Sequence, residues 1–105
     1  MWTSLIALLL NLTVVVGFSP LKVPVRYTLS PEFAAGAVCL IWDSGDEFAT
    51  PGSDCHTIED SLQRTWNKTL VLRHGTYAVW VTERGQDAQG NAFERRSPER
   101  LVRVD

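Results

Sequence analysis

Residues 69–82 read Thr69-Leu-Val-Leu-Arg-His-Gly-Thr-Tyr-Ala-Val-Trp-Val-Thr82, and this stretch decides the fold. Beyond Gly75 the side chains alternate, so that Tyr77, Val79 and Val81 share one face of the chain. A period of two in β-branched and aromatic residues is typical of a strand that packs one face on a core. The Gly-Thr-Tyr step before it predicts a tight corner. There the Tyr77 hydroxyl is expected to hydrogen-bond to upstream backbone, at the entry to the central strand of a β-sandwich.

Short apolar runs separated by turn residues fill the rest of the chain. We expect strands at 21–30, 37–42, 65–72, 76–84 and 100–104, the last extending back to Phe93 through an irregular section at Pro98. Pro24 predicts that the first of them lies at a sheet edge. Residues 47–64 are expected to form a long loop with a minor strand and a short helical turn at 58–62. Roughly six or seven short strands predict an all-β fold of two antiparallel sheets.

The length and charge of the chain limit the classes of function. The 105 residues are enough for one domain, and the 45% that are hydrophobic allow a small core. Ten basic and twelve acidic residues give no strong field for nucleic acid or an anionic membrane. The arginines near the C-terminus are interleaved with Glu94 and Glu99, which is typical of a solvated strand face and not of a nucleic-acid groove.

The N-terminal segment predicts the compartment. From Leu5 to Phe18 the residues are apolar apart from Asn11 and Thr13, as in a secretory signal peptide. We expect cleavage after Gly17, leaving residues 18–105 as a secreted, extracellular or lumenal domain. The alternatives are an uncleaved membrane anchor or a buried first strand. Asn67-Lys68-Thr69 is an N-glycosylation sequon, which has meaning in a secreted chain.

The two cysteines predict one disulfide. Cys39 and Cys55 are an even pair, which an oxidising compartment would join. A bond between them closes a short loop and is worth about 3 kcal/mol in the chain-entropy model. We expect this single bridge to clasp the two layers of the sandwich. The alternative is two free buried thiols in a cytosolic protein.

Two motifs resemble known extracellular repeats. Trp42-Asp43-Ser44-Gly45-Asp46, followed by the strand from Gly75, is similar to the Trp-Asp-Phe-Gly-Asp-Gly motif and Gly-Thr-Tyr strand of PKD domains. The order of that strand, then Asp87-Ala-Gln-Gly-Asn91, then Val104-Asp105 resembles bacterial immunoglobulin-like repeats. Both resemblances imply an immunoglobulin-like sandwich. Ser44 and Glu47 depart from the PKD motif, which has Phe and Gly at these places.

Four acidic residues are candidates for a cation site. Asp43, Asp46 and Glu47, with Asp54 further along, carry the oxygen ligands that Ca²⁺ prefers. The alternative, which we expect, is a turn whose carboxylates satisfy their own backbone amides, with no cofactor.

No residue pattern indicates catalysis. His56 is expected to be an exposed loop residue and His74 to lie in the corner before Tyr77, and two such histidines do not make a zinc site. Ser44 lacks the Gly-x-Ser-x-Gly context of a hydrolase nucleophile. The sequence therefore predicts that the protein is not an enzyme.

The sequence predicts a binding module. Trp80 points away from the face of Tyr77, so it is either an exposed contact anchor or covered by the long loop or by arginine stems. We expect a secreted or ectodomain module that binds an extracellular protein or glycan, or acts as a spacer, through loops 43–64 and 84–98. The alternatives are a small secreted enzyme or inhibitor with a Ca²⁺-supported loop, and a membrane-anchored accessory subunit that keeps its N-terminal segment.

Overall fold

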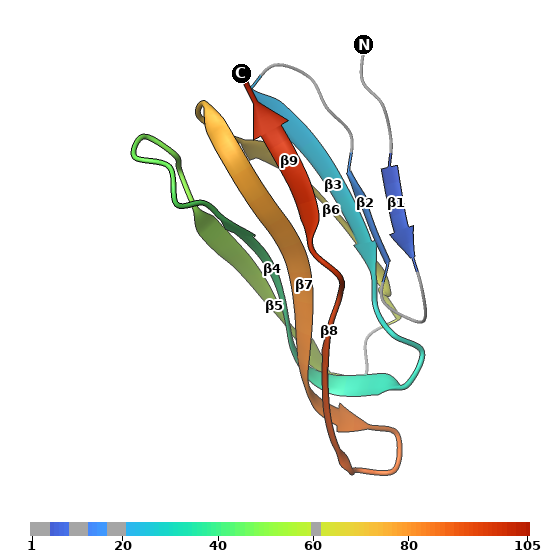
Figure 1. Cartoon of the computed structure of the whole chain (residues 1–105). Coiled ribbons are helices and arrows are strands. Elements are labelled where there is room, and N and C mark those ends of the chain that lie inside the picture. Colours follow the sequence, from blue (N-terminus) through green and yellow to red (C-terminus); the bar gives the residue numbers. More distant parts are fainter. Residues whose placement is uncertain (1–4, 9–12, 17–20, 60–61) are drawn as a thin grey trace.

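The chain folds into nine strands within the part that a computed structural model describes, residues 5–8, 13–16, 21–59 and 62–105 (Figure 1). In chain order the strands are β1 (Leu5–Leu8), β2 (Thr13–Val16), β3 (Lys22–Thr28), β4 (Phe33–Asp43), β5 (Gly52–Glu59), β6 (Thr65–Val71), β7 (Gly75–Asp87), β8 (Ala92–Arg96) and β9 (Arg100–Val104).

The strands form two antiparallel sheets that face each other (Figure 1). Sheet A has the order β1-β2-β3-β6, and sheet B has the order β5-β4-β7-β8 with β9 also paired to β7. Seven of the strands, β3 to β9, lie between residues 22 and 104. The prediction of an all-β fold with two antiparallel sheets is confirmed.

The strand that begins at Gly75 is the centre of sheet B. β7 pairs with β4 on one side, while β8 and β9 share its other side in succession. Between β8 and β9, the backbone N–H of Ser97 donates to the Val81 carbonyl at 2.9 Å, and the Val81 N–H donates to Ser97 Oγ at 2.9 Å. These bonds hold the irregular section next to Pro98 on β7, and the predicted interruption of the last strand is confirmed.

Alternating side chains of both sheets fill the core. Tyr77, Val79 and Val81 are each 0% exposed, as the period of two predicted. Facing residues of the other strands complete one cluster, which includes Val23, Val25, Tyr27, Leu29, Phe33, Val38, Leu40, Ile58, Leu70, Leu72, Val102 and Val104. Burying a large aliphatic or aromatic side chain stabilises the fold by about 1.5–3 kcal/mol, so this cluster is the main source of stability.

The alternation continues to Glu83, whose carboxylate is therefore buried between the sheets. Ser30 in the turn after β3 donates two hydrogen bonds to it, from its backbone N–H at 2.7 Å and from its hydroxyl. The guanidinium of Arg64 donates to the carbonyls of Ser30 at 2.6 Å and Phe33 at 2.9 Å. Because buried polar groups are costly unless they are hydrogen-bonded, these contacts hold the turn after β3 in place between the two sheets.

The prediction that β3 lies at a sheet edge is wrong, because β3 pairs with β2 on one side and β6 on the other. β2 is short, however, and its ladder ends at the pair Val16 and Val25. Pro24 lies just beyond that pair and is opposite Thr69 of β6.

The minor strand predicted within the long loop 47–64 is confirmed, and it takes eight of these eighteen residues. Residues 52–59 form β5, the edge strand of sheet B, and Ile58 is 0% exposed within it. The helical turn predicted from Ile58 is contradicted at its start by this strand, and residues 60 and 61 lie outside the described part. Loop 44–51 and the turn between β7 and β8 lie at opposite ends of the molecule (Figure 1). The two predicted recognition loops therefore do not form one surface.

The predicted disulfide between Cys39 and Cys55 is confirmed. The two residues are directly opposite each other on β4 and β5. Their neighbours Val38 and Leu40 point into the core, so the bridge lies on the outer face of sheet B. It therefore joins two strands of one sheet, and the prediction that it clasps the two layers is wrong.

The predicted signal peptide, residues 1–17, includes positions 1–4, 9–12 and 17 that lie outside the described residues. Its described parts, β1 and β2, form a hairpin that extends sheet A beside β3. No helix in the described part of the chain is long and apolar enough to cross a membrane.

Tyr27 makes the stability of the fold sensitive to alkaline pH. Its hydroxyl is buried without a hydrogen-bond partner among the described residues. Burial, with a smaller contribution from the Asp54 carboxylate, raises the pKa of Tyr27 from 10.0 to about 12. Above pH 10.0 the unfolded chain loses this proton while the folded chain keeps it.

The free energy of unfolding should therefore be independent of Tyr27 below pH 10.0 and fall as the pH rises toward about 12. The expected loss is at most about 2–3 kcal/mol. Urea unfolding at a series of pH values measures it, and the Tyr27→Phe variant should lack this loss. An equal loss in Tyr27→Phe would contradict the assignment.

Candidate functional site

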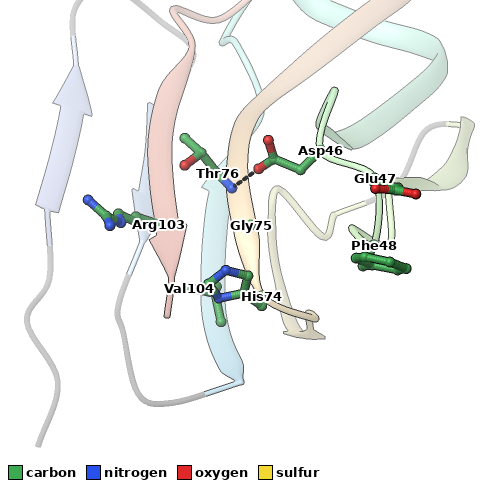
Figure 2. A pocket seen from close by; sticks show the side chains of 8 residues that line it. All are labelled: Asp46, Glu47, Phe48, His74, Gly75, Thr76, Arg103 and Val104. Atoms are coloured by element: carbon green, nitrogen blue, oxygen red, sulfur yellow. Dashed lines mark hydrogen bonds between the residues drawn. The ribbon is translucent and has the colours of Figure 1, made fainter.

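An open pocket of about 320 Å³ lies at the end of the sandwich where β7 begins and β9 ends (Figure 2). The loop between β4 and β5 forms its other wall. The lining residues are Asp46, Glu47, Phe48, His74, Gly75, Thr76, Arg103 and Val104. This pocket combines charged, aromatic and backbone groups from three segments of the chain.

The Trp-Asp-Ser-Gly-Asp segment clamps the first residues of β7. Ser44 Oγ donates to the Thr76 carbonyl at 2.7 Å, and the Thr76 N–H donates to the Asp46 carboxylate at 2.6 Å (Figure 2). The Asp46 N–H donates to Ser44 Oγ at 3.2 Å, which closes the turn. Ser44, which departs from the PKD motif, thus has a bonding role of its own.

Gly75 allows this clamp to close. Its φ is +155°, and a Cβ there would lie 3.0 Å from Asp46 Oδ2 and 3.4 Å from the Ala49 side chain. A larger residue would push Asp46 away from the Thr76 N–H. The glycine of the Gly-Thr-Tyr step is therefore needed for close approach between the loop and β7.

Tyr77 fixes the base of the same loop. Its hydroxyl donates to the Arg73 carbonyl at 2.7 Å, which is the upstream bond expected for a tyrosine at this corner. The hydroxyl also accepts the Thr50 N–H at 2.9 Å. Trp42 Nε1 donates to the Thr50 carbonyl at 3.0 Å. Both ends of the loop are thus hydrogen-bonded to the core strands.

The tip of this loop exposes Phe48. Its side chain is 69% exposed, and in Figure 2 it projects from the loop away from the Asp46–Thr76 bond. Glu47 and His74, which line the same pocket, are also exposed. Sequence reasoning missed Phe48. The available signal was an aromatic residue in a polar loop, where no strand pattern accounts for it.

The structure does not gather the predicted acidic ligands into one site. Asp46 is bonded to the Thr76 N–H, on another strand and not within its own turn. Asp54 lies on β5, 3.2 Å from His56 Nε2. Among the described residues, no group of three or more His, Cys, Asp or Glu side chains is placed to hold a metal ion.

Trp80 lies apart from the pocket, on the outer face of sheet B. It is partly exposed, and the guanidinium of Arg96 stands 4.3 Å from its ring centroid. The sequence left open whether Trp80 is an exposed anchor or is covered by a loop or by arginine side chains. In the structure the Arg96 side chain packs over the Trp80 ring, while loop 44–51 lies at the end of the sandwich. Trp80 therefore does not join Asp46 and Glu47 in one site.

The two histidines have different environments. His74 is exposed in the corner before Gly75, as predicted. The prediction that His56 is an exposed loop residue is wrong, because it belongs to β5 and its ring stacks on Trp66 with 4.0 Å between centroids. The period of two in Asp54, His56 and Ile58 was the sequence signal for this inward face.

No family model, curated protein or solved structure matches the chain.

Proposed function

We propose that the chain is a secreted or ectodomain module with an immunoglobulin-like or PKD-like sandwich, that it binds an extracellular protein without catalysis, and that loop 44–51 is its contact element. The single observation that carries this proposal is the 69% exposed Phe48 on a loop whose base is hydrogen-bonded to β7. A loop that is held in place before binding loses little conformational entropy on contact, and aromatic side chains are typical anchors of protein interfaces.

The compartment is supported by two independent features. The Cys39–Cys55 disulfide is compatible with an oxidising environment. Asn67 of the sequon is exposed on β6, an edge strand of sheet A. A glycan there would shield the edge from pairing with other chains, which is a common need of exposed edge strands.

The binding proposal predicts a partner that depends on Phe48. A partner retained from extracellular fluid by the immobilised protein should bind Phe48→Ala at least about 2 kcal/mol more weakly, because the aromatic anchor is removed. Calorimetry with the retained partner measures the difference. Leu101→Ala is the matched control, since Leu101 is 72% exposed on the outer face of sheet B. Equal affinity of Phe48→Ala and wild type would contradict the proposal.

Secretion is tested separately. Expression of the full chain in eukaryotic cells should release a product that begins at Phe18 and carries an N-glycan at Asn67, as read by mass spectrometry of the medium. Asn67→Gln should remove the glycan and leave the N-terminus unchanged. A product that keeps Met1 in the membrane fraction would instead support an anchored accessory subunit.

A further inference from the structure

β5 is an open edge of sheet B (Figure 1). Among the described strands it pairs with β4 alone, and it is eight residues long. Native proteins protect such an edge from other chains with Pro, Lys, a β-bulge or a short strand. The sequence of β5 contains no Pro, Lys or Arg, and its ladder with β4 keeps one register from Gly52 to Glu59. This edge can therefore pair with another strand.

Two neighbouring edges are protected where β5 is not. β6, the edge of sheet A on the same side of the sandwich, carries Lys68 and the sequon at Asn67. Because Trp66 contacts His56 across the sandwich, Asn67 next to it points to the outer face of sheet A, away from β5. The opposite edge of sheet B is divided between β8 and β9, with Pro98 in the interruption.

Cys39 and Cys55 form a pair that exchanges no main-chain hydrogen bonds. Their Cα atoms are 4.1 Å apart, close to the spacing of about 4.5 Å that such pairs have in antiparallel ladders. The bonds of β7 lead to the same result. The Val81 N–H and carbonyl bond to Ser97, on the side of β7 away from β4. By alternation, those of Thr82 point to Cys39 of β4, which leaves Cys39 no main-chain group for Cys55.

The main-chain N–H and carbonyl of Cys55 therefore point away from β4, to the open edge. By the same alternation those of Ser53 and Thr57 point there too. An antiparallel strand added to this edge would meet these residues at its hydrogen-bonded positions. Asp54 and His56 would lie at the positions between them, where facing side chains come closest.

We propose that β5 pairs with β5 of a second copy of the chain about a twofold axis at Cys55, so that the two B sheets become one continuous sheet. In this register Ser53 of each copy is opposite Thr57 of the other, and each such pair exchanges two main-chain hydrogen bonds. Asp54 of each copy is opposite His56 of the other. Facing hydroxyls, and a carboxylate that faces an imidazole, stabilise adjacent antiparallel strands.

The charges on β5 select a second copy as the occupant of this edge. Asp54 lies 3.2 Å from His56 Nε2 and is still 30% exposed, so its carboxylate can accept a further donor. A carboxylate on an edge strand opposes pairing with a strand that offers it no such donor. Registers centred on Asp54 or His56 would place like side chains opposite each other, whereas the register centred on Cys55 is self-complementary.

This interface is independent of the proposed binding function. It shares no residue with the pocket at loop 44–51, and Phe48 stays outside it. Loss of the dimer would therefore leave the contact role of Phe48 unaffected, and the two proposals can fail separately.

Sedimentation equilibrium of the purified protein over a range of concentrations tests the pairing, and a monomer–dimer equilibrium is expected. Thr57→Pro removes an N–H that points to the open edge, so the ladder to β4 should persist while association weakens at least about tenfold. Thr57→Ala is the matched control, because it keeps the N–H and should dimerise much as the wild type does. A protein that is monomeric at every concentration would overturn the proposal and leave this edge to a different chain. Equal association of Thr57→Pro and Thr57→Ala would also overturn it.

Amide hydrogen exchange of the wild type keeps the proposal falsifiable if Thr57→Pro fails to fold. At concentrations that populate the dimer, the N–H groups of Ser53, Cys55 and Thr57 should exchange at least about tenfold more slowly than in the monomer. Those of Asp54 and His56 point to β4 in both states and serve as the internal reference. A dimer in which the three edge amides exchange as fast as in the monomer would use another surface, which would refute pairing through β5.

Discussion

Replacing Gly85 with alanine is expected to lower the free energy of unfolding by at least about 3 kcal/mol. A Cβ at Gly85 would overlap the Ala35 carbonyl and lie 2.6 Å from the Cα of Gly36. These are backbone atoms of β4, and β4 and β7 are the two central strands of sheet B. The strands cannot separate locally without breaking their shared ladder. For a domain of this size, a loss of that magnitude is a large part of the total stability.

Urea denaturation followed by tryptophan fluorescence measures the effect of Gly85→Ala. Gly45→Ala is the matched control, because a Cβ at Gly45 meets no atom within 4 Å. Its free energy of unfolding should stay close to that of the wild type. If the two variants lost equal stability, the close approach of the β4 and β7 backbones would not be the reason that position 85 requires glycine.

Removing the disulfide is expected to cost about 3 kcal/mol, given a sequence separation of 16 residues. The loss should be concentrated in β5, because β5 is an edge strand that, among the described strands, pairs with β4 alone. The double variant Cys39→Ala/Cys55→Ala should therefore show faster hydrogen exchange in β5 than in β7. Urea denaturation gives the total loss.

Wild-type protein under reducing conditions provides the control for the double variant. Both should have the same midpoint in urea, since both lack only the bridge. A midpoint equal to that of the oxidised wild type would mean that β5 is held by Ile58 and its neighbours alone.

Local sequence patterns were sufficient to predict the strands in which buried and exposed side chains alternate regularly. The alternation around Tyr77 predicted the central strand and its buried face, and the Gly-Thr-Tyr step predicted a corner hydrogen bond to upstream backbone, which the Arg73 carbonyl accepts. β5 was predicted only as a minor strand within a long loop, because its sequence, Gly52-Ser-Asp-Cys-His-Thr-Ile-Glu59, is mostly polar. Its strand form depends on pairing with β4 and on the disulfide, neither of which a local window contains.

The candidate site was predicted only in part. Asp46 and Glu47 do line the pocket, whereas Asp43 and Asp54, the other two acidic candidates, do not. Which carboxylate meets which donor depends on loop geometry, and Asp46 is occupied by the Thr76 N–H, thirty residues away in sequence. Phe48 becomes a candidate contact residue only in the folded structure. There the hydrogen bonds of Ser44, Asp46 and Tyr77 hold its loop beside that pocket.

The sequence by itself determined that the chain is all-β, that Tyr77, Val79 and Val81 face a core, and that the two cysteines pair. These properties follow from side-chain periodicity and from the number of thiols, which are local or compositional. The tertiary structure alone decided that the bridge lies within one sheet, that Glu83 is buried against Ser30, and that His56 stacks on Trp66. Those contacts join residues that are distant in sequence. The same local pattern is compatible with many strand pairings, and the contacts depend on the register of the strands and on how the two sheets pack against each other.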